Sequence, residues 1–399
     1  MKPPVGVAIA LAVCSLIGGS ASAVAGAQSK GCGAGEVLTA PGCTGFRAAG
    51  RHVEAIVRES VEENDLRAAL VRVDVGNRTL ATASPGESMA GAPANLRMHF
   101  RIGSIAIPDL IDLLLQLQDR GRLSLDDPVS KWFPDLPNAD RVTLRMLANS
   151  TSGYADWVQG NDEFSATLLD DVFRQWKTRE LLDIALARPL VCAPGACFHY
   201  AHTNFVILDK VIHEVTGQSI AKLTRRRIFR PLGLRQTKIS ALPAIPSPAL
   251  HAYSGDRGVY EDSTSWSPSW GIAAQMTQTS TIGDVMKMAK ALGEGALISK
   301  RASRERFAPT TASLPNTLST PFSPNYYYGL GVLVLNSWEF QNPQLNGYTS
   351  IMAYMPSRRI AVALTVTNGR AAAATQTNFS ERLFTEISAY LTPDHLAAP

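Results

Sequence analysis

The chain has 399 residues, of which 45% are hydrophobic and 18% charged, so a large buried core is available. The formal net charge is only +4, and the single basic run, Arg225–Arg227, falls inside a predicted helix. Because a solvated helix face explains that run, the sequence carries no nucleic-acid-binding footprint.

The N-terminal residues have the pattern of an export signal. Lys2 supplies a positive start, an apolar run too short to span a bilayer covers 5–17, and small residues follow. We predict a signal peptide over 1–27, cleaved after Ala23 or Ala27, and a secreted or cell-envelope location. Lipid anchoring at Cys14 is disfavoured, because Val13 fits a lipoprotein signal poorly. No later segment is apolar and long enough to be a membrane helix.

Four cysteines remain after removal of this signal, and they allow three pairings. Proximity in sequence favours Cys32–Cys43 and Cys192–Cys197. Metal binding by all four is the alternative, but an exported chain favours disulfides. No His/Asp cluster has ligand spacing, so we expect neither metal nor cofactor. Residues 28–45 are expected to form an N-terminal extension held by the first disulfide.

Hydrophobic periodicity predicts a helix over 46–65 and a β-hairpin over 68–84, with its turn at Gly76-Asn77. An apolar helix over 110–118 is predicted to be buried on nearly all sides. Further helices are predicted at 142–147, 178–187, 203–216, 220–229, 281–292 and 379–391, and strands at 328–335, 349–355 and 360–366.

This order of elements predicts an α+β fold, with an antiparallel sheet built from both chain ends, flanking helices and an inserted, mostly helical subdomain. We place the main domain at 46–392. Its α/β part comprises 46–103 and about 270–392, and its helical part about 104–269. The strand containing Val71 and the strand over 360–366 are expected to belong to one sheet.

The stretch Phe100-Arg101-Ile102-Gly103-Ser104 precedes the apolar helix and places a serine hydroxyl at its start. A helix N-terminus stabilises negative charge, such as that which develops when a serine attacks an acyl carbon. Ser104 is therefore a candidate nucleophile. The alternative is that Ser104 only caps the helix.

The same stretch resembles the nucleophile motif F-R-x-G-S-x-x-K of the serine β-lactamase and penicillin-binding-protein superfamily. The resemblance covers roughly 46–391 and is closest to the class C β-lactamase and secreted DD-carboxypeptidase or esterase type. It implies that superfamily's fold and a serine nucleophile. Other segments that match in order are 123–129, 145–147, 151–153, 194–195, 203–205, 215–219, 227–234 and 328–331.

The active-site motifs depart from this pattern at three separated places. Ile107 stands where the superfamily carries the Lys that serves as base. Tyr200 matches the Tyr of the Y-x-N motif, but His202 replaces its Asn. In the third motif, Lys or His-x-Gly, Gln341 replaces the cation and Pro343 the Gly. Together these changes suggest that the chemistry was lost while the fold was kept.

Some of these residues have more than one interpretation. His199 and His202 could supply a substitute base, since imidazole titrates near neutral pH, or they could be packing histidines on a loop. The N–H of Gln344 could still act as an oxyanion donor, although Pro343 disturbs its strand. Ser150 stands where relatives usually carry His, and this change is weaker evidence for lost chemistry than the three motif changes are.

Two functions follow. The first is a catalytically impaired pseudoenzyme whose pocket binds a cell-wall peptide or small acyl ligand. The alternative is a divergent serine hydrolase, of the D-alanyl-D-alanine carboxypeptidase, esterase or β-lactamase type, that uses Ser104 with Tyr200 or His202. The pocket is expected to be lined by Ser104, Trp157, Tyr200, Trp270 and Tyr348, with His202 and Gln344 as further binding residues.

Overall fold

The computed structural model describes residues 32–271, 277–318, 320–375 and 377–398. The predicted signal peptide over 1–27, and Cys14 with it, lie outside the described residues. The segment 272–276 also lies outside them.

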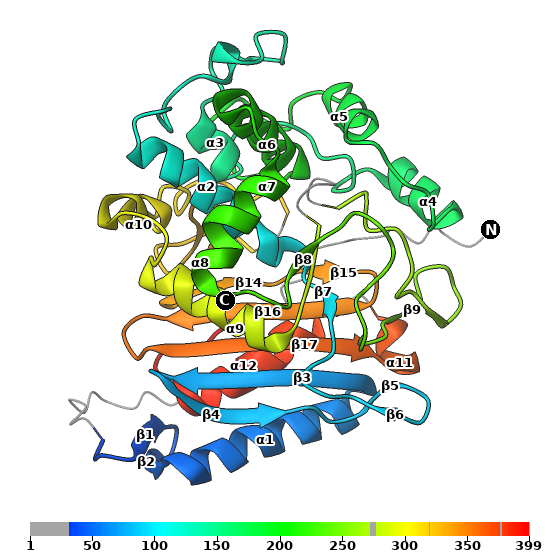
Figure 1. The fold of residues 1–399 in the computed structure, drawn as a ribbon, viewed down its shortest axis with the longest axis vertical. Helices are drawn as coiled ribbons and strands as arrows, with labels where there is room; N and C mark the ends of the chain where they lie inside the picture. The colour runs from blue at the N-terminus through cyan, green and yellow to red at the C-terminus, as the bar shows by residue number, and fades with distance from the viewer. Residues whose placement is uncertain (1–31, 272–276, 319, 376, 399) are drawn as a thin grey trace.

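The main sheet is antiparallel and has the strand order β12-β13-β14-β16-β17-β3-β4, with β15 added against β16 (Figure 1). β3 pairs with β17 from Leu66 opposite Asn368 to Val75 opposite Ile360, so the two chain ends form one sheet as predicted. The strands are β3 (Leu66–Val75), β4 (Arg78–Ala83), β12 (Tyr326–Tyr328), β13 (Leu333–Leu335), β14 (Trp338–Gln341), β15 (Gln344–Leu345), β16 (Tyr348–Met355) and β17 (Ile360–Asn368).

Helices cover both faces of this sheet. α1 (Phe46–Glu63) and α12 (Phe379–Leu391) pack together on one face, and α9 (Ile282–Glu294) lies on the other (Figure 1). α1 buries Ala49, Val53, Val57 and Val61, because a spacing of four residues places them on one side of the helix. β16 and β17 are buried at every residue, as expected for strands covered on both faces. The predicted α+β fold is confirmed.

A group of helices lies next to the sheet, in the upper part of Figure 1. The middle of the chain forms most of this group. Its central helix, α2, is buried at every residue from Ile107 to Leu117. The helices are α2 (Ile107–Asp119), α3 (Leu144–Ala148), α4 (Asp162–Asp170), α5 (Thr178–Leu186), α6 (His202–Thr216), α7 (Ile220–Thr224), α8 (Arg230–Leu232) and α10 (Lys300–Arg306), and α11 (Arg370–Ala373) lies beside β17.

Short strands connect these two parts. β7 (Phe100–Arg101) and β8 (Lys238–Ile239) flank β11 (Gln278–Ser280) in a small sheet beside Ser104. The other pairs are β1 (Glu36–Thr39) with β2 (Gly42–Gly45), β5 (Glu87–Met89) with β6 (Ala92–Pro93), and β9 (Tyr253–Ser254) with β10 (Glu261–Asp262).

Two predicted elements differ from the structure. The strand expected over 328–335 is a hairpin of β12 and β13, in which Tyr328 lies opposite Leu333. Gly331 in the connection has a φ of +68°, which is incompatible with a continuous strand. The helix expected over 220–229 is α7 followed by a π-helical turn at Arg225–Phe229.

Both predicted disulfides are present. Cys32–Cys43 joins the start of the described chain to β2, and Cys192–Cys197 closes a loop beside the helical group. Within the described ranges, no helix combines the length and the apolar character needed to cross a bilayer. The same residues contain no group of three or more His, Cys, Asp or Glu side chains that could hold a metal ion.

Candidate functional site

Ser104 lies in a 3-10 turn, Gly103–Ala106, that connects β7 to α2. The N-cap residue of α2 is Ala106 and no side chain caps this helix, so the interpretation of Ser104 as a helix cap is wrong. Gly103 has a φ of +48°, and a Cβ there would lie 2.7 Å from Pro343 Cβ. Glycine therefore allows the turn carrying Ser104 to approach the connection between β14 and β15.

Tyr200 is the direct partner of Ser104. The Ser104 Oγ and Tyr200 Oη atoms are 3.1 Å apart and form a hydrogen bond between two hydroxyl groups. Burial raises the pKa of Tyr200 above its ordinary value, and the hydrogen bond from Ser104 opposes this only in part. The phenol is therefore protonated at neutral pH and is a poor acceptor for the Ser104 proton.

Ile107 fills the position of the motif lysine with apolar packing. The side chain is fully buried and points toward Gly331, where a Cβ would lie 2.9 Å from Ile107 Cγ2 and 2.5 Å from Ile111 Cγ1. The carbonyl of Gly331 accepts a hydrogen bond of 2.7 Å from Gln341 Nε2. Neither the first nor the third motif thus places a cation beside Ser104.

A carboxylate–imidazole pair lies next to Tyr200. His202, the first residue of α6, bonds through Nδ1 to Asp156 Oδ2 at 2.9 Å, and its ring meets that of Tyr200 edge-on with centroids 5.3 Å apart. Burial alone would raise the pKa of Asp156, but the charge and hydrogen bond of His202, with the N–H groups of Gln159 and Val158, hold that pKa below its usual range.

This pairing fixes the tautomer of the imidazole. An ionised Asp156 only accepts hydrogen bonds, so Nδ1 of His202 carries a proton, and Nε2 is an acceptor whenever the ring is neutral. His202 was identified in the sequence by its motif position, whereas Asp156 was missed. No spacing rule marks an aspartate 46 residues before its partner, since the fold alone brings the two together.

The residues around Ser104 line a hollow that opens to solvent, here called the Ser104 pocket. Of the residues predicted to form a site, the following line this pocket: Ser104, Tyr200, His202, Trp270 and Gln344. Among the described residues that line it, none is Lys, Arg, Asp or Glu. The remaining lining residues are Gly103, Gln159, Pro268, Gly271, Thr277, Gln278, Tyr328, Leu333, Gln341, Asn342, Pro343 and Leu345.

Trp157 and Tyr348, also expected to line the pocket, do not. Trp157 is fully buried and donates from Nε1 to the carbonyl of Trp270 at 2.8 Å, so it supports a lining residue from behind. Tyr348 is likewise buried and donates to the carbonyl of Leu250. An aromatic side chain can satisfy its polar atom inside the core, and sequence position does not distinguish that from lining a pocket.

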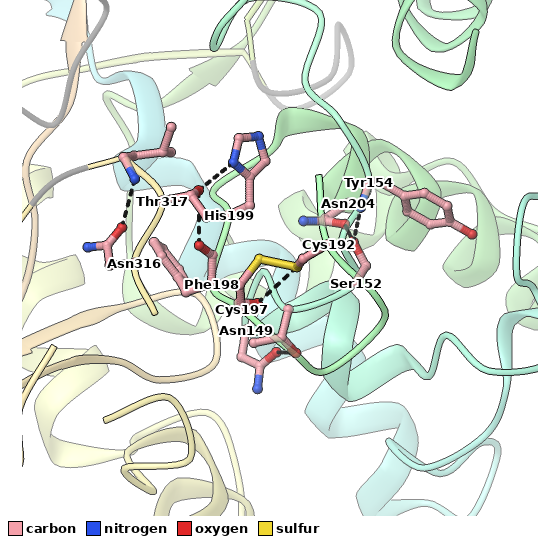
Figure 2. Close-up of a disulfide and its surroundings, with 12 residues drawn as sticks. Asn149, Ser152, Tyr154, Cys192, Cys197, Phe198, His199, Asn204, Asn316 and Thr317 are labelled. Atoms are coloured by element: carbon pink, nitrogen blue, oxygen red, sulfur yellow. Dashed lines mark hydrogen bonds between the residues drawn. A yellow bond between two sulfur atoms is a disulfide. The ribbon is translucent and has the colours of Figure 1, made fainter. Parts of the chain in front are cut away.

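The loop closed by Cys192–Cys197 is followed by Phe198 and His199 (Figure 2) and, next in the chain, by Tyr200. Its backbone is hydrogen bonded to the segment after α3, with Gly195 N donating to Thr151 O at 2.8 Å and His199 N donating to Ser150 O at 2.9 Å. The ring of His199 pairs through Nδ1 with Thr317 Oγ1 at 2.7 Å, so His199 is a buried packing residue. The disulfide therefore anchors the residues that hold Tyr200 against Ser104.

We expect loss of this disulfide to loosen the Tyr200 segment. Replacing both cysteines, Cys192→Ser with Cys197→Ser, should lower the free energy of unfolding by about 2 kcal/mol, the chain-entropy contribution of so short a loop. Hydrogen exchange should also increase at the amides of 198–201. Cys32→Ser with Cys43→Ser is the matched control, because it should cost similar stability and leave exchange at 198–201 unchanged. Equal exchange in both variants would contradict the anchoring role.

Fold and site together define a class of protein in which an antiparallel sheet and a helical group meet around a serine hydroxyl, Ser104, that is hydrogen bonded to Tyr200. The family model described as Beta-lactamase matches residues 53–384, most of the chain. The protein belongs to the β-lactamase family, and the resemblance inferred from its motifs is confirmed.

Several known proteins are similar to this chain. A protein of Bacillus subtilis (strain 168) designated as a candidate penicillin-binding protein, PbpX, is 29% identical over 247 residues, which cover 60% of this chain and 58% of that protein. Esterase EstB of Burkholderia gladioli is 27% identical over 195 residues, covering 46% and 50%. The chain thus spans little more than half of these relatives' lengths. Among solved structures, a D-stereospecific amidohydrolase from Streptomyces sp. has a TM-score of 0.71 and 27% identity, covering 85% of this chain and 99% of that one.

Proposed function

We propose that this protein is an exported, ligand-binding member of the β-lactamase family in which Ser104 is not a working nucleophile. The observation that carries the proposal is the pairing of two protonated hydroxyls, Ser104 and Tyr200, in a pocket whose described lining has no Lys or Arg. A serine hydroxyl needs an adjacent base to attack an acyl group, and Ile107 removes the base that the motif would supply.

The ligand we propose is a small acyl compound or a cell-wall peptide. The names of similar proteins support this class, since they include an esterase, a D-stereospecific amidohydrolase and a D-alanyl-D-alanine-carboxypeptidase/endopeptidase, AmpH of Escherichia coli. The pocket combines apolar side chains such as Trp270 and Leu345 with polar ones, which suits a ligand of this kind. Export is supported by the signal pattern over 1–27 and by the two disulfides.

A second candidate function rests on the Asp156–His202 pair. The bond to Asp156 engages Nδ1 and leaves Nε2 free of that carboxylate, and a histidine oriented by a carboxylate is a general arrangement for activating a serine. In this alternative, Ser104 acts with Tyr200 or His202 and the protein is a divergent serine hydrolase. The ring contact between Tyr200 and His202 is the observation that favours it.

Intact mass spectrometry separates the two functions. The purified protein is incubated with a fluorophosphonate, which is uncharged, and with a β-lactam, with Ser104→Ala as control. We expect no stoichiometric adduct from either reagent, because loss of a general base costs ~10²–10⁴ in rate. An adduct that forms in the wild type and disappears in Ser104→Ala would reject the proposal. Its further loss in His202→Asn would establish the second candidate.

A further inference from the structure

The end of α2 that lies away from Ser104 carries a cluster of arginines. Arg120 and Arg122 follow the last residue of α2, and Arg226 and Arg227 belong to the π-helical turn after α7. α2 packs against both α7 and this turn within the helical group (Figure 1), so residues far apart in the sequence share one surface. Arg120, Arg122 and Arg226 are exposed, and Arg227 is partly buried. These four residues are here called the arginine surface.

Two of the four arginines contact the ends of helices. Arg120 Nη1 donates to the carbonyl of Gln116 at 3.2 Å, near the C-terminus of α2, and Arg122 Nη2 donates to the carbonyl of Val215 at 2.8 Å, near the C-terminus of α6. A helix C-terminus carries about half a negative charge, so two such ends offset roughly one of the four positive charges and about three remain. Helix capping therefore explains only part of the cluster.

The remaining charge has no carboxylate partner. No Asp or Glu in the described ranges forms an ion pair with the arginine surface. Burial, together with the like charges of the other three arginines, lowers the pKa of Arg227. Asp119, the carboxylate next to Arg120 in sequence, instead accepts the N–H and the hydroxyl of Ser299 at 3.0 and 2.6 Å. Like charges gathered without a counter-charge attract an anionic ligand.

The side chains of the arginine surface favour phosphate groups. A planar guanidinium donates two parallel hydrogen bonds to the oxygens of one phosphate, which a lysine cannot do, and all four positions carry Arg. None of the large apolar side chains exposed in the described chain lies within 107–122 or 220–230. Phe229, the one aromatic residue in these two ranges, is buried. The surface thus offers neither a platform for stacking bases nor an apolar group for insertion into a bilayer.

We propose that the arginine surface binds a linear phosphodiester polymer through its phosphate groups. Ser104 precedes the first residue of α2 and Arg120 follows its last, and a helix of this length spans about 20 Å. None of the four arginines lines the Ser104 pocket. The polymer site is therefore separate from that pocket and independent of the function proposed for it. It would hold the protein on an anionic polymer while the pocket stays open to its own ligand.

Fluorescence anisotropy with labelled poly(glycerol phosphate) at a series of NaCl concentrations tests this site. The slope of log affinity against log salt concentration should be about −3, since each phosphate contact of a single chain contributes about −0.7. Arg226→Gln with Arg227→Gln should reduce the slope by about half, because two contacts are lost. Arg226→Lys with Arg227→Lys keeps the charge, so the slope should persist while the affinity falls at every salt concentration.

Two controls accompany these variants. Arg51→Gln with Arg58→Gln removes the same charge from exposed positions of α1 and should keep the slope of the wild type. Ser104→Ala should bind the polymer as the wild type does, so failure of this inference leaves the proposed function untouched. No binding by the wild type at low salt would overturn the inference, and so would an equal loss of slope in the two glutamine pairs.

Two further probes separate this polymer from other phosphate-bearing partners. An oligothymidylate with the same number of phosphates should bind no more tightly than poly(glycerol phosphate), because its bases find no aromatic side chain on which to stack. Vesicles containing phosphatidylglycerol should also bind no more tightly, because the surface has no apolar group to insert. Tighter binding of the oligothymidylate or of the vesicles than of the polymer would contradict recognition through phosphates alone.

Discussion

Restoring the three motif residues, Ile107→Lys with Gln341→His and Pro343→Gly, is expected to make Ser104 react measurably with a fluorophosphonate. A lysine at position 107 would lie one helical turn from Ser104, whose hydroxyl bonds to Tyr200, and a cation close to that pair would lower the pKa of the phenol. A restored base is worth ~10²–10⁴ in rate. Replacing Pro343 with glycine removes the ring that constrains the strand carrying the N–H of Gln344, the candidate oxyanion donor, and one such donor is worth a further ~10²–10³.

The rate of adduct formation by intact mass spectrometry measures this recovery. Two controls accompany it: Ser104→Ala in the restored background, and a variant in which Ile111→Lys replaces Ile107→Lys. Ile111 is equally buried and also contacts the Gly331 position, so the second control carries a similar cost of burying a lysine one turn farther from Ser104. If a folded restored variant reacts no faster than wild type, the pocket has been reshaped beyond the three positions.

The native protein is expected to lose stability as the pH rises from 6.5 to 9. Burial raises the pKa of Asp109 and of Glu381 to about 7 and that of Glu339 to about 8. In the unfolded chain all three carboxyls are ionised throughout this range, whereas the native state still holds their protons at its lower end. The native state therefore binds more protons than the unfolded state, and its free energy of unfolding falls as the pH rises, by about 4 kcal/mol in total.

Burial also raises the pKa of Asp112, and that of Asp209 to about 6, so these two carboxyls act in the same direction. Asp156, whose pKa is lowered mainly by His202 against the effect of burial, is ionised in both states. His199, whose pKa is lowered by burial, acts in the opposite direction only below about pH 7. Urea unfolding at both pH values measures the change, and Glu339→Gln should remove about half of it, because the amide has no proton to lose. A free energy of unfolding that is unchanged or higher at pH 9 would contradict the buried, protonated state of these carboxyls.

The frame of the fold follows from local sequence patterns. The apolar spacing of α1, the turn at Gly76-Asn77 and the continuous apolar runs of β16 and β17 are each read within a window of a few residues. The alternation of these patterns along the chain also predicts that both ends share one sheet, as the pairing of β3 with β17 confirms. The predicted ends of strands are wrong where one backbone angle interrupts a strand, as the positive φ of Gly331 does between β12 and β13.

Some features of the candidate site could be predicted from the sequence, and others are visible only in the tertiary structure. The sequence by itself determined the identity of Ser104, the missing lysine at Ile107 and the altered motif at Tyr200 and His202, because these are matters of residue type at a motif position. It also determined both disulfides, since pairing within short loops is set by proximity along the chain.

Only the tertiary structure decided what surrounds those residues. Asp156 meets His202, Asp109 lies behind Gln278 and Glu381 lies behind Asn342 through contacts between segments 39 to 169 residues apart. Trp157 and Tyr348 are placed in the core, although their types suit a pocket equally well. The physical reason is that electrostatic environment and accessibility depend on distances in space, which the fold sets and no local pattern of residues encodes.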